Sequence, residues 1–374
     1  MFLESLRLHD FRNIGDATLE FSPGFNLIIG ENGQGKSNLL EAIALLATGR
    51  SFRKATPGAM GYHGRPGYRL KGITQAMGLT HKLEFSGEKQ RQTARLNGKA
   101  MSLASAMGQV LAAVVSTPDS PGLVQGGPGE RRDYLDWVVF SAIRQHAATA
   151  RDYHGALKAR NKLLKTGCMD GQQLSAWEEQ LATLGATITY RRRRVVKKIV
   201  EQIPHYLEAL ALDPERFMLR LSCQLDRYKD AEKESDLAIH YRQMLKKSRG
   251  SDQRTGATSI GPHRDDMPFL IDGRLLARFG SRGQRKRFIL ALKLTEASLL
   301  QESVGEAPLF LLDDPVAELD REGIERLVKL LCLQKQQIFL TACNTGEIPR
   351  LEEPSTTFLV ADGAFQTLTE QMNK

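Results

Sequence analysis

The sequence has few cysteines, no long apolar run and no low-complexity segment. Its four cysteines, Cys168, Cys223, Cys332 and Cys343, are widely separated and show no C-x-x-C spacing. This pattern argues against a zinc site or a disulfide framework and is compatible with a reducing cytosol. No apolar run approaches the ~20 residues of a membrane-spanning helix, and the charged first residues do not form a signal peptide. We therefore expect a cytoplasmic protein with no membrane partner.

The chain also has fewer acidic than basic residues. The chain has 52 Lys and Arg against 43 Asp and Glu, which gives a formal net charge of +9. An excess of this size is compatible with a nucleic-acid partner. The 374 residues are 41% hydrophobic and 25% charged, which is ordinary for a globular protein and sufficient for two or three domains.

The clearest motif is a phosphate-binding loop at residues 30–37, which match G-x-x-x-x-G-K-[ST] at each fixed position. Apolar residues before the loop predict a buried strand, and residues 38–43 predict the opening of a helix. Glycines let backbone N–H groups surround a phosphate, and the helix N-terminus adds partial positive charge. We expect Lys36 to reach the phosphates of ATP and Ser37 to hold Mg²⁺. The expected nucleotide-binding residues here are Gly30, Glu31, Asn32, Gly33, Gln34, Gly35, Lys36 and Ser37.

Two later segments complete the expected nucleotide site. Ser281, Gly283 and Gln284 stand before an amphipathic helix, where S-x-x-Q could also be an ordinary capping box. Four apolar residues at 309–312 then predict a buried strand that ends in paired acids. We expect Asp313 to hold Mg²⁺ and Asp314 to polarise the attacking water.

The order of these segments is that of an ATP-binding-cassette head. We therefore predict an α/β P-loop NTPase fold in which a mixed sheet is joined to an antiparallel sheet. Residues 1–125 and 251–374 are assigned to this head, and residues 126–250 to an inserted helical arm. A stripe of apolar residues at spacings of three and four supports a long helical pair over 131–210. Residues 246–256 are polar and are expected to form a connector back to the head.

The expected arm carries a basic cluster that has two interpretations. Its side chains point around a helix axis, so it could be a solvated face or a set of phosphate contacts. Both remain open. The candidate DNA-binding residues of the basic cluster are Arg191, Arg192, Arg193, Arg194, Lys197 and Lys198.

Six segments together resemble one protein family, the bacterial RecF family. They are residues 11–13, 30–43, 49–53, 261–266, 281–284 and 311–320. The resemblance implies an SMC-related ATPase head with a short helical arm, which forms a homodimer on binding ATP. It implies binding to single-stranded DNA and to gapped or junction duplexes, with RecR and RecO as partners. Roles in recombinase loading, replication and the SOS response follow from it, with slow ATP hydrolysis acting as the switch.

The resemblance also assigns roles to single residues. Asp314 corresponds to the catalytic base, Ser281 acts across the dimer, and Arg12 touches nucleotide phosphate. The sequence departs from the family pattern at Arg285, at Ala317 and in residues 116–119. The metal- or water-contacting role of this last segment is left open.

Two other function classes fit parts of the sequence. The ATPase subunit of a membrane transporter would share the motifs, although the long insertion between Lys36 and Asp313 argues against so compact a head. A small-molecule kinase would share only the loop. Within residues 261–266, His263, Asp265 and Asp266 could hold a metal, but a turn ordered by aspartate hydrogen bonds is favoured.

Overall fold

The structure is a computed structural model, and it describes most of the chain. The described residues are 1–101, 108, 110–118, 120, 122–166, 171–226, 233–317, 319–349 and 355–368. Cys168, Asp119 and Glu318, which belong to segments considered above, lie outside them. The chain divides into two compact units. The first unit comprises Met1–Pro121, His205–Leu212 and Arg282–Lys374, and the second comprises Gly122–Pro204 and Asp213–Ser281.

The first unit contains an antiparallel sheet of six strands in the order β2-β1-β4-β5-β6-β7. Alternating apolar and polar residues bury one face of it, so that Leu6 and Leu8 of β1 are inaccessible while Arg7 between them is exposed. Asn97 and Gly98 have positive φ and form the turn of the hairpin that joins the last two strands. The strands are β1 (Phe2–Phe11), β2 (Ile14–Glu20), β4 (Gly67–Ala76), β5 (Leu79–Glu88), β6 (Arg91–Leu96) and β7 (Lys99–Met101).

The second sheet of this unit is mixed, in the order β15-β14-β3-β13-β12-β8, and only β15 runs antiparallel to its neighbour. Its inner strands are continuous apolar runs because both of their faces are buried. The strands are β3 (Phe25–Ile29), β8 (Ala113–Ser116), β12 (Leu309–Leu312), β13 (Ile338–Ala342), β14 (Ser355–Ala361) and β15 (Ala364–Leu368).

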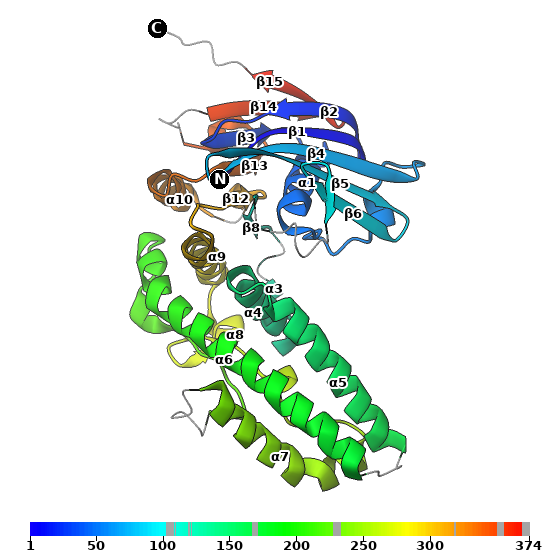
Figure 1. Ribbon diagram of the computed structural model, residues 1–374. Helices are drawn as coiled ribbons and strands as arrows, with labels where there is room; N and C mark the ends of the chain where they lie inside the picture. The colour runs from blue at the N-terminus through cyan, green and yellow to red at the C-terminus, as the bar shows by residue number, and fades with distance from the viewer. Residues whose placement is uncertain are drawn as a thin grey trace. The chain divides into compact units, whose positions relative to one another are not determined.

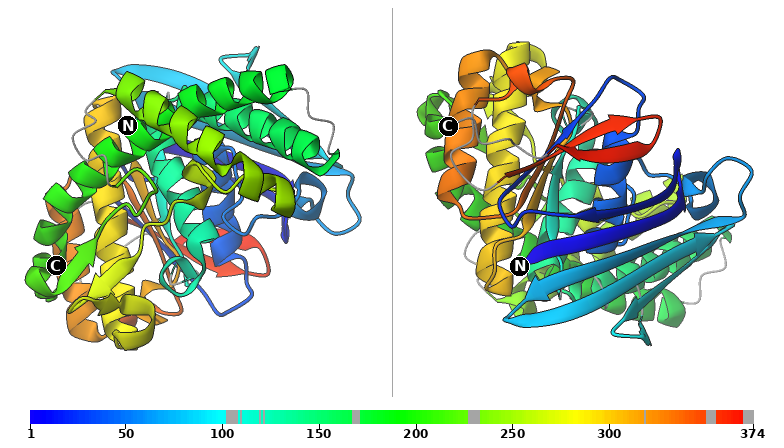
Figure 2. Two further views of the ribbon diagram at one scale, coloured as in Figure 1. Left: turned by 90° about the horizontal axis from the view of Figure 1, so that it is seen from below. Right: turned by 90° about the horizontal axis from the view of Figure 1, so that it is seen from above.

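Helix α1 (Lys36–Thr48) lies between these two sheets (Figure 1). Most of its residues are buried, which explains its nearly continuous apolar sequence. Helices α9 (Arg282–Val304) and α10 (Arg321–Leu333) cover the side of the mixed sheet away from α1 (Figure 2). Short 3₁₀ turns lie at Pro57–Met60, Pro315–Ala317 and Thr345–Glu347. Parallel strands between helical layers bring the loops at their carboxyl ends to one edge, where ligands bind in such folds.

The second unit is mainly helical. Its long helices pack through a shared core that includes Tyr153, Leu181, Ile188, Leu237 and Tyr241. A small sheet of order β11-β10-β9 completes it. Its elements are α3 (Gly122–Gln125), α4 (Pro128–Ala142), α5 (His146–Thr166), α6 (Gly171–Ala209, with its last turn in the first unit), β9 (Phe217–Leu219), α7 (Glu234–Thr255), β10 (Phe269–Ile271), β11 (Arg274–Leu275), α8 (Leu276–Phe279) and 3₁₀ turns at Pro214–Arg216 and Pro262–Arg264.

The expected head fold with an inserted helical region is confirmed, but one detail was wrong. Residues 246–256 are not a connector, since helix α7 continues to Thr255 and ends at Gly256 in the left-handed conformation. Arg249 and Asp252 in this segment bond to other residues of the helical unit, so its polarity reflects structural ion pairs. The proposed domain limits stay a prediction; in the structure, the second compact unit extends to Ser281.

Candidate nucleotide-binding site

The phosphate-binding loop joins β3 to α1, and its backbone requires glycine at several positions. Gly33 and Gly35 have φ of 84° and 121°, in the region that side chains other than glycine disfavour. A Cβ atom on Gly30 would lie 2.4 Å from the carbonyl oxygen of Val360 in β14. Helix α1 begins directly after Gly35, so its first N–H groups, which have no helical partner, are available to an anion at the loop.

Lys36 lies inside the loop, with a relative exposure of 6%. Its Nζ donates to the carbonyl oxygens of Gly30 and, at 3.0 Å, Glu31. The ammonium group is therefore held against the loop backbone, where a phosphate oxygen would be a further acceptor. This placement fits the role that the sequence assigns to Lys36.

Ser37 and Asp313 are brought together although 276 positions separate them. Ser37 Oγ donates to Asp313 Oδ1 at 2.8 Å, and Thr341 Oγ1 donates to the same oxygen at 3.0 Å. Burial raises the pKa of the Asp313 carboxyl, which the two hydroxyl donors only partly offset. Hydroxyl and carboxylate oxygens are the ligands that Mg²⁺ prefers, and a cation would stabilise the ionised carboxylate that burial disfavours. The residues present therefore fit the expected magnesium site.

Asp314 follows in a strained conformation, with φ of 49°. Its backbone N–H donates to Thr341 Oγ1 at 2.8 Å. Since β12 and β13 are parallel neighbours, with Leu312 opposite Leu340, Thr341 comes level with the two aspartates. Thr341 was not predicted as a site residue. The available signal was a polar residue at the carboxyl end of a buried strand.

Two segments distant in sequence hold Gln34 of the loop. Asn13 Nδ2 donates to the Gln34 carbonyl at 3.0 Å, and the Gly363 N–H donates to the same oxygen at 2.9 Å. The Asp362 N–H donates to Gln34 Oε1 at 2.6 Å. The turn between β14 and β15 thus supports the loop, and nothing in the sequence indicated this.

Glu41 connects two of the family-like segments. This carboxylate in α1 is inaccessible to solvent and accepts two hydrogen bonds from Arg12, at 2.9 and 2.7 Å. It also accepts from Ser51 Oγ and, at 3.4 Å, from Arg53. A charged residue within an apolar helix was the signal that could have identified Glu41. The contact between Arg12 and nucleotide stays a prediction, because the Arg12 guanidinium here bonds to Glu41 and to the Ala59 carbonyl.

Ser281, Gly283 and Gln284 surround the start of α9. Ser281 is exposed directly before the first helical residue, Arg282, while Gly283 and Gln284 are half-buried in the first turn. A 23-residue helix presents N–H groups and partial positive charge at this end. The action of Ser281 on a second copy stays a prediction.

The segment that departs from the family pattern begins beside Asp313. The Asp313 N–H donates to the Ser116 carbonyl at 2.9 Å, at the end of β8. Thr117 then donates its N–H to Ser120 Oγ at 2.8 Å. The remaining residue of interest, Asp119, lies outside the described part of the chain.

The basic cluster divides into a buried residue and partly or fully exposed ones. Arg192 is 3% exposed and bonds to Asp136 at 2.8 Å and to Asp265 at 2.9 Å. The Arg192 guanidinium is therefore used inside the helical unit, which argues against Arg192 as a DNA-contacting candidate. The other members stay candidates: Arg191 and Arg193 are half-buried, and Arg194, Lys197 and Lys198 are exposed.

The 261–266 segment is structural in this arrangement. Tyr153 bonds to His263 Nδ1 at 2.7 Å, Asp265 pairs with Arg192, and Asp266 accepts from Arg131 at 2.7 Å. Burial lowers the pKa of His263 to about 4. Each side chain thus has its own protein partner, which supports the turn interpretation over a metal site.

Comparisons with known proteins agree with this geometry. A family model described as an AAA domain matches residues 5–254. The DNA replication and repair protein RecF of Magnetococcus marinus is 51% identical over 379 residues, covering 100% of this chain and 99% of the relative. The chain belongs to the RecF family. The RecF protein of Geotalea uraniireducens is 34% identical over 365 residues, covering 97% of this chain and 99% of the relative.

Solved structures confirm the fold class. A structure of the recombination mediator protein RecF with ATP, from the RecFOR pathway, matches with a TM-score of 0.88 and 30% identity, covering 98% of this chain and 99% of that one. The Smc head bound to the C-winged helix domain of ScpA matches with a TM-score of 0.55 and 14% identity, covering 100% and 98%. The second likeness concerns the fold alone. The chain therefore has the ABC-ATPase head fold that RecF shares with SMC proteins.

Membership of the RecF family favours the DNA-repair hypothesis over a transporter subunit or a small-molecule kinase. As a separate observation, none of the helices in the described ranges is both long and apolar enough to cross a bilayer.

Proposed function

We propose that this chain is an ATP-switched DNA clamp of recombinational repair. ATP binds at residues 30–37 with Mg²⁺ on Ser37 and Asp313, and the Ser281 end of a second copy closes on its γ-phosphate. The closed homodimer holds single-stranded, gapped or junction DNA. Slow hydrolysis, with Asp314 as the base, removes the bridge and releases the DNA. Acting with RecR and RecO, the clamp supports recombinase loading, replication and the SOS response.

One observation supports the dimer above others: Ser281 is exposed at the N-terminal end of a long helix. ATP carries several negative charges, and a helix N-terminus favours an anion. The same chain also carries the hydrogen-bonded oxygen atoms of Ser37 and Asp313. Each copy therefore has both parts of a shared site, the Mg²⁺-binding residues and the exposed Ser281. Two copies can exchange these parts symmetrically, as closed dimers do.

The test is sedimentation of the full chain with ATP, with ADP and without nucleotide. We expect ATP alone to raise the mass to that of a dimer. Lys36→Arg and Ser281→Arg should both remain monomeric. Ser235→Arg is the matched control, because Ser235 is exposed in the first turn of another helix, α7, and this variant should still dimerise.

DNA binding is measured in parallel on a gapped duplex. Tighter binding with ATP than with ADP supports the clamp. A dimer under every condition, or DNA affinity that is independent of nucleotide, would contradict it.

A further inference from the structure

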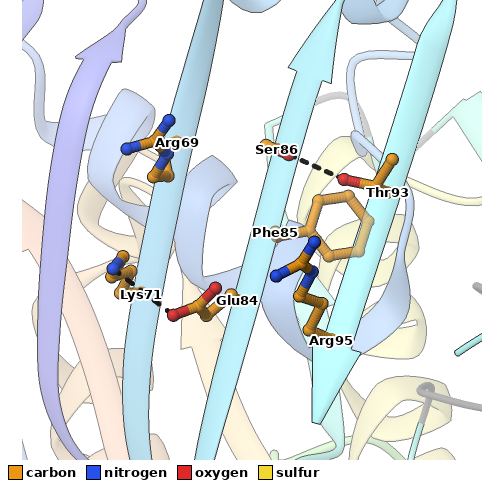
Figure 3. A pocket seen from close by; sticks show the side chains of 7 residues that line it. All are labelled: Arg69, Lys71, Glu84, Phe85, Ser86, Thr93 and Arg95. Carbon is orange, nitrogen blue, oxygen red and sulfur yellow. Dashed lines mark hydrogen bonds and ion pairs between the residues drawn. The ribbon is translucent and has the colours of Figure 1, made fainter. Parts of the chain in front are cut away.

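A groove lies on the solvent face of the antiparallel sheet, away from the nucleotide-binding loop residues. One part of it is a cavity of about 250 Å³ across β4, β5 and β6 (Figure 3). The alternation of these strands puts their polar residues on this face and their apolar residues on the face that packs against α1. The lining residues are Arg69, Lys71, Glu84, Phe85, Ser86, Thr93 and Arg95.

Cations exceed anions in this cavity by three to one. Lys71 pairs with Glu84 at 3.3 Å, and both side chains are substantially exposed. Arg69 and Arg95 are exposed and form no ion pair with any residue in the described ranges. The exposed Arg7 stands next to Lys71 in the sheet register. Arg7, Lys71, Glu84 and Arg95 therefore form one row across four strands, which spans about 14 Å at the ~4.8 Å strand spacing.

The groove continues beyond this row. A second cavity of about 930 Å³ shares Arg69, Ser86 and Thr93 with the first and reaches Lys89 and Arg91. Ser86 lies opposite Arg69 and Thr93 opposite Ser86 in the sheet register, and the two hydroxyl groups bond to each other at 2.7 Å. The second cavity also contains the acidic residues Asp10 and Glu88, so its cations are partly balanced. The result is an extended surface that carries cations and hydroxyl groups on the strands and on the turn between β5 and β6.

We propose that this groove binds the phosphate backbone of DNA. This inference rests on the proposed function, which makes DNA the polyanion in question, and it identifies where the sheet would contact it. Arg69, Lys71 and Arg95 would pair with successive phosphates, and the Ser86 and Thr93 hydroxyls would donate to phosphate oxygens. Contacts of this kind position a protein on DNA without reading sequence.

The chemistry of the groove favours a phosphate backbone over other anions. The tyrosine and phenylalanine that line the cavities, Tyr68 and Phe85, are 4% and 3% exposed, so neither ring is available to stack on a base. The third ring, that of His9 in the second cavity, is exposed and lies 3.0 Å from Asp16. Protein interfaces usually centre on apolar or aromatic anchors, and the exposed lining of the first cavity is mainly polar. A free nucleotide would be expected at a glycine loop or a helix N-terminus, and strands supply the first cavity.

The test compares three variants by fluorescence anisotropy of a labelled gapped duplex, with ATP, at several salt concentrations. Arg69→Ala with Arg95→Ala removes two unpaired cations. Each phosphate contact contributes about one unit to the slope of log K against log salt, so we expect a slope lower by about two. At ~0.1 M salt this corresponds to binding roughly 10- to 60-fold weaker. The matched control, Lys329→Ala with Lys335→Ala, removes two exposed cations from α10 and the segment that follows it and should change neither quantity.

Glu84→Gln provides a test in the opposite direction. It removes the carboxylate that neutralises Lys71, and we expect DNA binding to tighten several-fold with a steeper salt slope. Glu84 lies on the strand surface, so its replacement should leave the fold intact. Loss of folding therefore cannot explain tighter DNA binding by this variant.

The outcomes separate the groove from the clamp. If wild-type protein binds DNA with ATP and the Arg69→Ala, Arg95→Ala protein binds equally well, the groove assignment is wrong and the clamp proposal stands. If wild-type protein shows no ATP-dependent DNA binding, the clamp proposal itself fails. Loss of ATP binding in the double variant would assign the groove to nucleotide and overturn the inference.

Discussion

Three oxygen atoms from separate parts of the chain meet at the predicted magnesium site. Ser37 and Thr341 both donate to Asp313 Oδ1, and Thr341 also accepts from the backbone of Asp314. One hydroxyl group thus orients both acidic residues. Thr341 is fully buried, so no water replaces this group without rearrangement.

Thr341→Val should remove this orientation while preserving the shape of the side chain. We expect ATP hydrolysis to slow roughly ten-fold, which corresponds to ~1.4 kcal/mol in the barrier. The loss of a buried hydrogen-bond donor should also lower the free energy of unfolding by about 1–3 kcal/mol. Single-turnover hydrolysis and urea unfolding measure the two effects.

The control for this variant is Thr357→Val, at a partly exposed position in β14. It should change neither the hydrolysis rate nor stability appreciably. Unchanged hydrolysis in Thr341→Val would show that the threonine has no part in positioning the aspartates.

At the scale of one element, helix α6 shows why a charge run does not define a surface. Four consecutive arginines point around its axis because successive residues are about 100° apart. Arg192 faces the interior, where Asp136 and Asp265 flank its guanidinium. Despite burial, hydrogen bonds with His146 and then with Arg192 hold the pKa of Asp136 well below its usual range. Lys197, on the solvent side, is 79% exposed.

Arg192→Gln should therefore destabilise the helical unit strongly. Removing the guanidinium leaves the buried carboxyl of Asp265 without its partner, and losses of about 3–5 kcal/mol are typical when one member of a buried pair is removed. Lys197→Gln, five residues along the same helix, should change stability by less than about 0.5 kcal/mol. Urea unfolding followed by circular dichroism compares them. Equal stabilities would contradict the buried network.

At the scale of the whole molecule, one chain passes four times between two compact units. The Ser37–Asp313 pair of the predicted ATP site and the proposed DNA groove both belong to the first unit, which combines the first third of the chain with the last quarter and with residues 205–212. The basic cluster belongs to the second. The two candidate DNA-contacting surfaces can therefore be altered independently.

Binding of ATP should stabilise the folded protein by mass action. At a concentration 100 times the Kd, the gain is about 2.7 kcal/mol, which raises the Tm by several degrees for a protein of this size. Lys36→Ala should abolish the shift, because its ammonium lies inside the phosphate-binding loop. Lys335→Ala, at an exposed position, should retain it. A thermal-shift titration with ATP measures the rise in Tm for each variant. An equal rise in Lys36→Ala and Lys335→Ala would exclude the predicted ATP site.

The sequence by itself determined the local chemistry of this protein. The glycine spacing, the Lys36–Ser37 pair, and the apolar run that ends in two aspartates depend on neighbours along the chain. The strand, the loop and the start of the helix that these motifs predict are also local features of the backbone. The order of these segments was sufficient to predict the fold class, and the comparisons confirm it.

Only the tertiary structure decided which distant side chains meet. Thr341, Glu41 and the turn at Asp362 join the site through strand register and helix packing, which a single sequence does not reveal. The same holds for the buried direction of Arg192 and for the row of cations across β1, β4 and β6. Burial and cross-strand contact are properties of the packed chain, so the role of a charge depends on where packing places it.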